Sequence, residues 1–320
     1  MTSSPTTSRH RYFVVGAGGL LGGAVVTQLA RRPGAEVVTA VVPWHDEDDS
    51  VAALAEQFRA VASGPYAWSL VWCAGAGVVA SGPAALAQEH RVVEAFLARA
   101  AHELGETGTA SRGTAFVASS AGGVYAGSAA PPFDERTRPE PLAPYGWNKL
   151  RVEEAFEHWA GVTGVPVVVG RFANIYGPGQ DLGKAQGLVS QLCLAHLEGR
   201  PSSIYVPMDT IRDYLFVDDA ASMTLDALDR ATTVAAGTVV TKILASGLGI
   251  TIGALIAELQ RVVGRRPRVV WGSHASASRQ ALDLRFRSVV WPELDARMLT
   301  PVAAGIHRTV LSLQEGRRSS

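Results

Sequence analysis

A tyrosine and a lysine lie four residues apart in the stretch PYGWNK, at Tyr145 and Lys149. Lysines are scarce, because the whole chain contains only Lys149, Lys184 and Lys242. Positions i and i+4 of a helix share one face, so the phenol and the ammonium are expected to lie together. A nearby ammonium favours the phenolate form of a tyrosine. The pair therefore predicts proton exchange with an alcohol or a ketone.

A serine adds a third candidate to this pair. Ser120 ends the apolar run TAFVASS, 25 residues before Tyr145. A serine hydroxyl donates and accepts hydrogen bonds, so it can hold the oxygen with which the tyrosine exchanges its proton. The spacing of Tyr145 and Lys149 is a weak signal alone, and Ser120 strengthens it. The three residues together predict oxidation or reduction of a hydroxyl-bearing carbon.

Three glycines at fixed spacing predict a binding site for a dinucleotide. Gly16, Gly19 and Gly22 of GAGGLLG follow the apolar run 12–15 and open a predicted helix over 20–32. In this context the first glycine permits a tight turn, the second lets the backbone approach a pyrophosphate, and the third allows close packing of helix on strand. The helix N-terminus adds free amides and a positive dipole end. The alternative is a tight turn that binds nothing.

The second predicted strand lacks the acidic residue that such a site usually has. A carboxylate is expected about 20 residues beyond the glycines, where it binds the adenosine ribose. Val41 or Val42 stands there instead, and Asp46 is the nearest carboxylate that could reach back. No arginine follows the strand, and the acidic residues 46–49 would repel a 2′-phosphate. These charges favour NAD as the cofactor, with NADP still possible.

The elements that must position these residues alternate along the chain. Such alternation predicts an α/β fold with a Rossmann-type doubly wound parallel sheet, whose ligands bind at the carboxyl ends of the strands. Ser50 is the expected N-cap of the second helix. The expected strands are 12–15, 36–42, 69–75, 114–120 and 166–172, and the expected helices are 20–32, 50–61, 83–104 and 145–158.

The chain is expected to divide into two domains, because the alternation of predicted strands and helices stops near residue 178 and resumes near residue 211. Both ends of the chain are polar. The predicted sections are a disordered N-terminus (1–11), a dinucleotide-binding Rossmann domain (12–177, with 211–247 returning to it), a smaller C-terminal substrate-binding α/β subdomain (178–210 and 248–312) and a loose tail (313–320).

Bulk composition excludes several classes of protein. Hydrophobic residues make up 47% and charged residues 18% of the chain, as in ordinary globular proteins. Lys plus Arg and Asp plus Glu both total 29, and the zero net charge gives no field to hold nucleic acid or an anionic membrane. Two distant cysteines and scattered histidines fit no metal-ligand spacing. No apolar run is long enough to span a membrane, so a cytoplasmic protein without a metal is expected.

Five motifs occur in the order found in a known enzyme family, namely GAGGLLG, ASSAGGVYAG, PYGWNK, RFANIYGPGQ and RDYLFVDDA. On these motifs the chain resembles the extended short-chain dehydrogenases/reductases, in their NAD-dependent nucleotide-sugar epimerase/dehydratase branch. The resemblance covers most of residues 12–312. It implies a bound NAD or NADP, a nucleoside-diphosphate sugar as substrate, and a homodimer built from helices 83–104 and 145–158.

The resemblance also implies roles for individual residues. Tyr145 would be the acid/base, Lys149 would hold the nicotinamide ribose, and Ser120 would position the reacting oxygen. Ser119 is the fallback, because Ala121 occupies the commoner position of the hydroxyl. The implied substrate contacts are Ser120, Asn174, Arg212 and Arg279. The implied cofactor contacts are Gly16, Gly19, Leu20, Leu21, Gly22, Ala74, Gly75, Tyr145, Lys149 and Ala173.

Several residues also fit purely structural roles. These are a loop cap for Asn174, a surface ion pair for Arg212 with Asp213, a helix cap for Asp218 and Asp219, a solvated charge for Arg279, and packing for Trp44, Trp72 and Trp147.

The resemblance favours an epimerase, which removes a hydride from a ring carbon and returns it to the other face. A 4,6-dehydratase needs an Asp-Glu pair after the serine, where this chain has Ala121 and Gly122. A keto-sugar reductase stays an alternative, which the missing ribose acid favours. A dinucleotide sensor without turnover is less favoured, because Tyr145 and Lys149 are both retained. The family has a further strand within residues 42–68, where only a loop and one helix are expected here.

Overall fold

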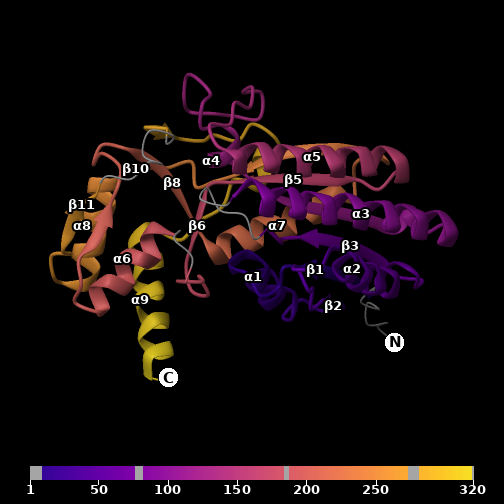
Figure 1. Cartoon of the computed structure of the whole chain (residues 1–320), viewed down its shortest axis with the longest axis horizontal. Helices are drawn as coiled ribbons and strands as arrows, with labels where there is room; N and C mark the ends of the chain where they lie inside the picture. Colours follow the sequence, from indigo (N-terminus) through magenta and orange to yellow (C-terminus); the bar gives the residue numbers. More distant parts are fainter. Residues whose placement is uncertain (1–8, 76–81, 184–186, 273–280, 319–320) are drawn as a thin grey trace, which may run out of the picture.

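The computed structural model describes residues 9–75, 82–183, 187–272 and 281–318. Arg279, a predicted substrate contact, lies outside the described residues. Within them, the elements form a larger group around a parallel sheet and a smaller group at one end of that sheet (Figure 1). The expected α/β fold with a doubly wound parallel sheet is confirmed.

The main sheet has six parallel strands in the order β2-β1-β3-β4-β5-β9. Its strands are short apolar runs rich in valine and aromatic residues, as expected of a parallel sheet covered on both faces. Consecutive side chains of a strand point to opposite faces, so each strand contributes to two cores. The strands are β1 His10–Val15, β2 Ala35–Thr39, β3 Ala67–Trp72, β4 Gly113–Ser120, β5 Val167–Phe172 and β9 Val239–Leu244.

Helices cover both faces of this sheet. One core contains Phe58, Trp72, Phe96 and Phe156 and lies under α2, α3 and α5. The opposite core lies under α1 and α7. The helices are α1 Leu20–Leu29, α2 Glu47–Ala62, α3 Pro83–Thr107, the short α4 Ala121–Val124, α5 Pro144–Thr163 and α7 Val217–Ala231, with a 3-10 turn at Ala110–Arg112.

The smaller group holds a second sheet, a strand pair and three helices that share their own core. In the second sheet β8 lies between β10 and β12 and also pairs with β6, while β11 pairs with β7. The elements are β6 Asn174–Tyr176, α6 Leu188–Leu197, β7 Ser202–Ile204, β8 Ile211–Phe216, β10 Gly249–Thr251, α8 Ile252–Val263, β11 Val269–Trp271, β12 Asp283–Leu284, the 3-10 turn Pro292–Leu294 and α9 Val302–Arg318.

The structure corrects predicted boundaries at both ends of the chain and the sheet membership of one strand. Strand β1 begins at His10, because His10 and Arg11 pair with both β2 and β3. Helix α9 continues to Arg318, since Leu313 still packs on the core of the smaller group. Strand β8 opens the stretch 211–247 but belongs to the second sheet, so only α7 and β9 of that stretch join the main sheet.

The path from β2 to β3 confirms the expected departure from the family pattern. A loop and α2 connect the two strands with no strand between them, so β2 is the edge of the main sheet. The expected N-cap of α2 is wrong. Asp46 caps this helix by accepting a hydrogen bond from the Asp49 amide, whereas the buried Ser50 hydroxyl donates to the Pro43 carbonyl.

Candidate active site

In the glycine turn after β1, the backbone comes into close contact with the segment after β3 and with the first turn of α1. Gly16 has φ +86°, and a Cβ there would lie 2.6 Å from the Ala74 amide nitrogen at the end of β3. A Cβ on Gly22 would lie 2.2 Å from the Gly16 carbonyl oxygen. Only glycine fits either position, because one needs a positive φ and both need close approach. The turn therefore fixes the start of α1 directly above the carboxyl ends of β1 and β3.

The start of α1 has the features of an anion site. Gly19 is its N-cap and has no side chain to occupy the first amides of the helix. Apart from Gly18 itself and its chain neighbours, no atom of the described residues lies within 4 Å of a Cβ built on Gly18. The first amides of a helix lack intrahelical acceptors and stand at the positive dipole end. The amides of Leu20, Leu21 and Gly22 thus fit the pyrophosphate of a dinucleotide.

Ser120 and Tyr145 meet at Gly123. Ser120 is the N-cap of α4, where its hydroxyl accepts a hydrogen bond of 3.1 Å from the Gly123 amide. A Cβ on Gly123 would lie 3.0 Å from Cε1 of Tyr145 and 3.3 Å from Oγ of Ser120. A Cβ on Gly146 would lie 2.2 Å from the Gly123 carbonyl oxygen. The first turn of α5 is thus packed on α4, which holds the phenol beside the serine.

Lys149 lies on the same face of α5, between the tyrosine and the end of β3. Its ammonium is 5.7 Å from the centre of the Tyr145 ring. A Cβ on Gly75 would lie 2.8 Å from the Lys149 Nζ. The lysine side chain is 8% exposed and stands 3.9 Å from the Glu89 carboxylate of α3, whose side chain is 9% exposed. The structure therefore brings together the catalytic candidates and Gly75, one of the predicted cofactor contacts.

Sequence analysis missed Glu89. Its carboxylate also accepts a 3.5 Å hydrogen bond from the Asn148 amide, next to Lys149. The available signal was a charged residue on an otherwise apolar helix face, since Leu86, Val93 and Phe96 at helical spacing from it are buried. The partner of Glu89 is 60 residues away in sequence, and no local pattern identifies such a contact.

A buried network of charged and polar side chains connects β5, α5 and the end of β4 next to Ser120. The Arg171 guanidinium of β5 binds the Glu153 carboxylate of α5 at 2.6 Å and the Tyr125 hydroxyl at 2.6 Å. Burial alone would lower the pKa of Arg171, but the hydrogen bonds and charge of Glu153 outweigh it and raise that pKa. Ser119 donates to the same carboxylate. The Ser119 hydroxyl is engaged in this network, which leaves Ser120 as the serine beside Tyr145.

The predicted substrate residues lie on the neighbouring strands β6 and β8. Arg212 is 8% exposed, and one of its guanidinium nitrogens donates to the Ile211 carbonyl. Asp213 is fully buried and accepts hydrogen bonds from the Ser246 amide and hydroxyl and from the Gly247 amide. The alternative of a surface ion pair is therefore wrong. The Asn174 amide donates to the Asp213 carbonyl at 3.1 Å.

Strand β12 connects these residues to the catalytic candidates. Leu284 of β12 is in register with Arg212 of β8. A Cβ on Gly122, two residues beyond Ser120, would lie 3.7 Å from a methyl group of Leu284. Strand β12 therefore lies between β8, which carries Arg212, and the turn that contains Ser120. Burial lowers the pKa of Arg212 and raises the pKa of Asp213 to about 6.

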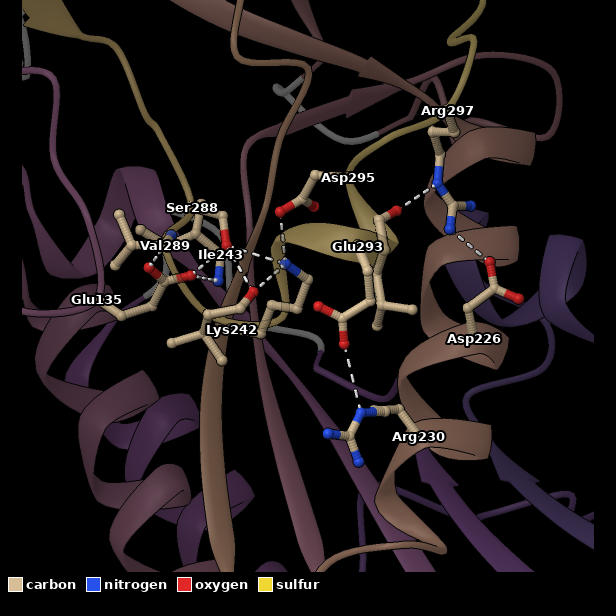
Figure 2. Close-up of polar contacts among 12 residues, drawn as sticks. Glu135, Asp226, Arg230, Lys242, Ile243, Ser288, Val289, Glu293, Asp295 and Arg297 are labelled. Carbon is tan, nitrogen blue, oxygen red and sulfur yellow. Dashed lines mark hydrogen bonds and ion pairs between the residues drawn. The ribbon is translucent and has the colours of Figure 1, made fainter.

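Hydrogen bonds around Lys242 and Glu135, together called the clasp, hold the loop that precedes α5 and Tyr145. Figure 2 shows Lys242 of β9, which is fully buried and donates to the Ser288 hydroxyl, the Val290 carbonyl and the Asp295 carboxylate at 2.7–2.9 Å. Glu135 of the loop accepts from Ser288 and from the amides of Ile243 and Val289. The segment after β12 is thus attached both to β9 and to the loop between α4 and α5.

The remaining sequence predictions have mixed outcomes. The predicted helix cap is wrong for Asp218 and Asp219, because α7 already begins at Val217 and Phe216 is its N-cap. Both carboxylates lie in the first turn of α7 and bind the C-terminal segment, Asp218 through Arg308 and Asp219 through the Thr300 amide. Packing is confirmed for Trp72, which is 1% exposed. It is wrong for Trp147, which is 53% exposed. Ala173 is buried, and its amide donates to the Leu244 carbonyl at the end of β9.

The described residues contain neither a candidate metal site nor a candidate membrane span. No group of three or more His, Cys, Asp or Glu in them is arranged to hold a metal ion. None of the helices that the structure describes is both long enough and apolar enough to cross a membrane.

Comparison with known proteins identifies the family. The sequence model of the NAD-dependent epimerase/dehydratase family matches residues 12–241. The chain therefore belongs to this family, whose members are described as NAD dependent. The expected family is confirmed.

Curated relatives match over shorter stretches. The chain is 32% identical over 97 residues to a dTDP-L-rhamnose 4-epimerase of Burkholderia thailandensis, which is 30% of this chain and 27% of that protein. It is 32% identical over 112 residues, 35% of this chain and 37% of the relative, to a putative UDP-glucose 4-epimerase of Methanocaldococcus jannaschii. A dTDP-glucose 4,6-dehydratase of Salmonella typhimurium is 36% identical over 91 residues, 28% of this chain and 24% of the relative. These matches span well under half of each relative's length.

Solved structures match over nearly the whole chain. A UDP-glucose 4-epimerase of Thermotoga maritima, solved with UDP-glucose, has a TM-score of 0.78 at 21% identity and covers 96% of this chain and 99% of its own. The UDP-glucose 4-epimerase of Thermus thermophilus, solved with NAD, has a TM-score of 0.78 at 20% identity, with 95% and 99% covered. At such identities these likenesses support the fold alone.

Proposed function

We propose that this protein is an NAD(P)-dependent nucleotide-sugar epimerase that removes a hydride from a ring carbon and returns it to the opposite face. The observation that carries the proposal is the convergence of Ser120, Tyr145 and Lys149 beside Gly75 and the glycine turn. Relatives named as 4-epimerases of nucleotide sugars support the same substrate class.

The proposed roles of the residues are those that the family resemblance implies, and the positions of the side chains support them. Tyr145 takes the proton of the reacting hydroxyl and later gives it back, since its phenol adjoins Ser120 on the site side of α5. Ser120 donates a hydrogen bond to the same oxygen and orients it. A bound nicotinamide supplies the acceptance and return of the hydride. Lys149 holds the ribose next to that ring and contributes positive charge near the phenol.

The diphosphate of the substrate has candidate partners on the smaller group of elements. Arg212 supplies a guanidinium on β8, and Asn174 supplies an amide on the adjacent β6. A guanidinium binds phosphate oxygens through two parallel charge-assisted hydrogen bonds. Arg212 is therefore the proposed anchor for the diphosphate, with the sugar extending toward Ser120 and Tyr145.

A nucleotide keto-sugar reductase is the alternative function. One observation favours it: β2 ends without a carboxylate for the adenosine ribose, so the cofactor is held by fewer polar contacts. An epimerase must retain its cofactor between two half-reactions, whereas a reductase must exchange it. Ala121 and Gly122 follow Ser120, so the acid and base for dehydration are missing at that position.

The experiment identifies both the cofactor and the product. The purified protein is denatured, and the released dinucleotide is measured by mass spectrometry. Intact protein is then incubated with UDP-glucose, UDP-glucuronic acid and dTDP-glucose without added cofactor, and separately with a nucleotide 4-keto-sugar and NADPH. Retained NAD and a 4-epimeric product without added cofactor support the epimerase. An empty protein that oxidises NADPH only when a keto-sugar nucleotide is present contradicts it and supports the reductase.

A further inference from the structure

The adenosine half of the dinucleotide must lie over β1 and β2. The catalytic candidates stand at the end of β4 and the start of α5, on one side of the glycine turn. Strand order β2-β1-β3-β4 places β2 on the other side of that turn. A dinucleotide lies across the carboxyl ends of such strands with its pyrophosphate at the turn. The region beyond the end of β2 is therefore the place for adenine.

Two carboxylates near the end of β2 already have partners. The Asp46 carboxylate accepts from the Asp49 amide at 2.9 Å and caps α2. The Glu47 carboxylate pairs at 2.8 Å with Arg91 of α3. Between Thr39 and Asp46 the chain contains no acidic residue. The usual hydrogen bonds to the ribose hydroxyls have no obvious source here, so other contacts must hold the adenosine.

Two exposed apolar side chains occupy the same loop. Val41 is 97% exposed and Trp44 is 38% exposed. The Trp44 ring stands perpendicular to the buried ring of Trp72 at the end of β3, with 6.3 Å between centroids. Its carbonyl accepts from the Gln88 side chain and its amide donates to the Val42 carbonyl, both at 3.0 Å. The indole is thus anchored near the end of β3 while part of its surface stays open.

We propose that Trp44, together with Val41, forms the contact surface for the adenine ring and replaces the missing carboxylate. This rests on the proposed function, since it requires a bound dinucleotide. A base stacked on an aromatic side chain gains roughly 1–3 kcal/mol, or about 5- to 100-fold in affinity. Neighbouring acidic residues disfavour a 2′-phosphate, so the same surface selects NAD over NADP.

Calorimetric titration tests this contact without turnover. The titrants are NAD, 5′-AMP and nicotinamide mononucleotide, which lacks adenine. Trp44→Ala is expected to weaken NAD and 5′-AMP by about 5- to 100-fold and to leave nicotinamide mononucleotide unchanged. Trp44→Phe keeps a stacking ring and is expected to retain most of the affinity. The matched control is Trp147→Ala, because that tryptophan is also exposed but lies on α5.

A second measurement covers the case in which Trp44→Ala folds poorly. 5′-AMP is expected to quench the tryptophan fluorescence of the parent protein more strongly than that of Trp44→Phe. Equal quenching, or unchanged affinity of Trp44→Ala for NAD and 5′-AMP, overturns the adenine contact and leaves the proposed function standing. Failure of the parent protein to bind NAD or NADP overturns both.

Discussion

At the scale of single residues, the site depends on glycines that no other residue can replace. The roles of Gly16 and Gly22 could be predicted from the sequence, because each has a direct steric meaning at its spacing. The choice of Ser120 over Ser119 was predicted by motif, and the structure adds a reason, since Ser119 binds Glu153. Glu89 could not be predicted, because its contact with Lys149 depends on how α3 packs against α5.

Gly146 offers a test of how tightly Tyr145 must be held. In Gly146→Ala the new methyl group would lie 2.2 Å from the Gly123 carbonyl oxygen, so the first turn of α5 must move away from α4. We expect a loss of about 1–3 kcal/mol in the free energy of unfolding. Displacing the phenol should also lower kcat by roughly 100-fold. Denaturant unfolding and steady-state kinetics measure the two effects.

The matched control is Gly161→Ala on the same helix, where no atom lies within 4 Å of the new methyl group. This change should stabilise the protein by about 0.5–1 kcal/mol and leave kcat unchanged. If Gly146→Ala kept the kcat of the parent protein, close packing of α5 on α4 would not be what positions the tyrosine.

At the scale of elements, strands and helices of the main sheet follow from apolar patterning, but pairing partners do not. The sequence places residues 211–247 with the Rossmann domain, yet β8 within this stretch pairs with β10, β12 and β6 of the second sheet. Its pattern of buried residues resembles that of the main strands, so only tertiary contacts decide which sheet it joins. Likewise, the polar residues at the end of α9 do not indicate a helix by themselves. They continue a helix that is fixed by buried apolar residues in its earlier turns, Ile306 and Val310.

Asp213 of β8 predicts a pH-dependent stability. Burial raises its pKa in the folded protein to about 6, from an ordinary value of 3.8. The folded state therefore binds this proton more tightly, and the stabilisation is complete below pH 3.8 and lost as the pH rises through 6. The expected loss is about 3 kcal/mol over this range.

The measurement compares unfolding free energies of the parent protein and Asp213→Asn from pH 4 to pH 7. Asparagine has no titrating proton, so the difference between the two curves isolates Asp213. Between pH 4 and pH 7 the parent protein should lose roughly 2 kcal/mol of unfolding free energy relative to the variant, because the full effect is reached only below pH 3.8. A difference that stays constant across this range would show that burial does not perturb this carboxyl group.

At the scale of the whole molecule, the candidate cofactor residues and the candidate substrate residues lie on different groups of elements. The glycine turn and Ser120 follow β1 and β4 of the main sheet and Tyr145 opens α5, whereas the strands that carry Asn174 and Arg212, β6 and β8, belong to the smaller group (Figure 1). The segment after β12 connects the two groups through the clasp at Lys242 and Glu135 (Figure 2). The homodimer that the family resemblance implies stays a prediction, which sedimentation analysis can test.

The edge position of β2 is also a property of the whole sheet, and it differs from the family pattern. Loss of one strand leaves β2 at the sheet edge and shortens the path to α2. The sequence predicted this loss from the length and polarity of residues 42–68. It could not predict what takes the place of the missing contacts, because the exposure of Val41 and Trp44 depends on how the loop rests on Trp72.

The most direct test of the account is whether a bound nicotinamide is reduced by a nucleotide sugar through Tyr145. The protein loaded with NAD is mixed with UDP-glucose, UDP-glucuronic acid or dTDP-glucose, and absorbance at about 340 nm, where reduced nicotinamide absorbs, is followed in a stopped-flow instrument. With one of these substrates the parent protein should show a transient rise. Tyr145→Phe should bind NAD normally and show at least a 100-fold slower rise. An equally fast rise in Tyr145→Phe would contradict the role of the phenol as the proton acceptor.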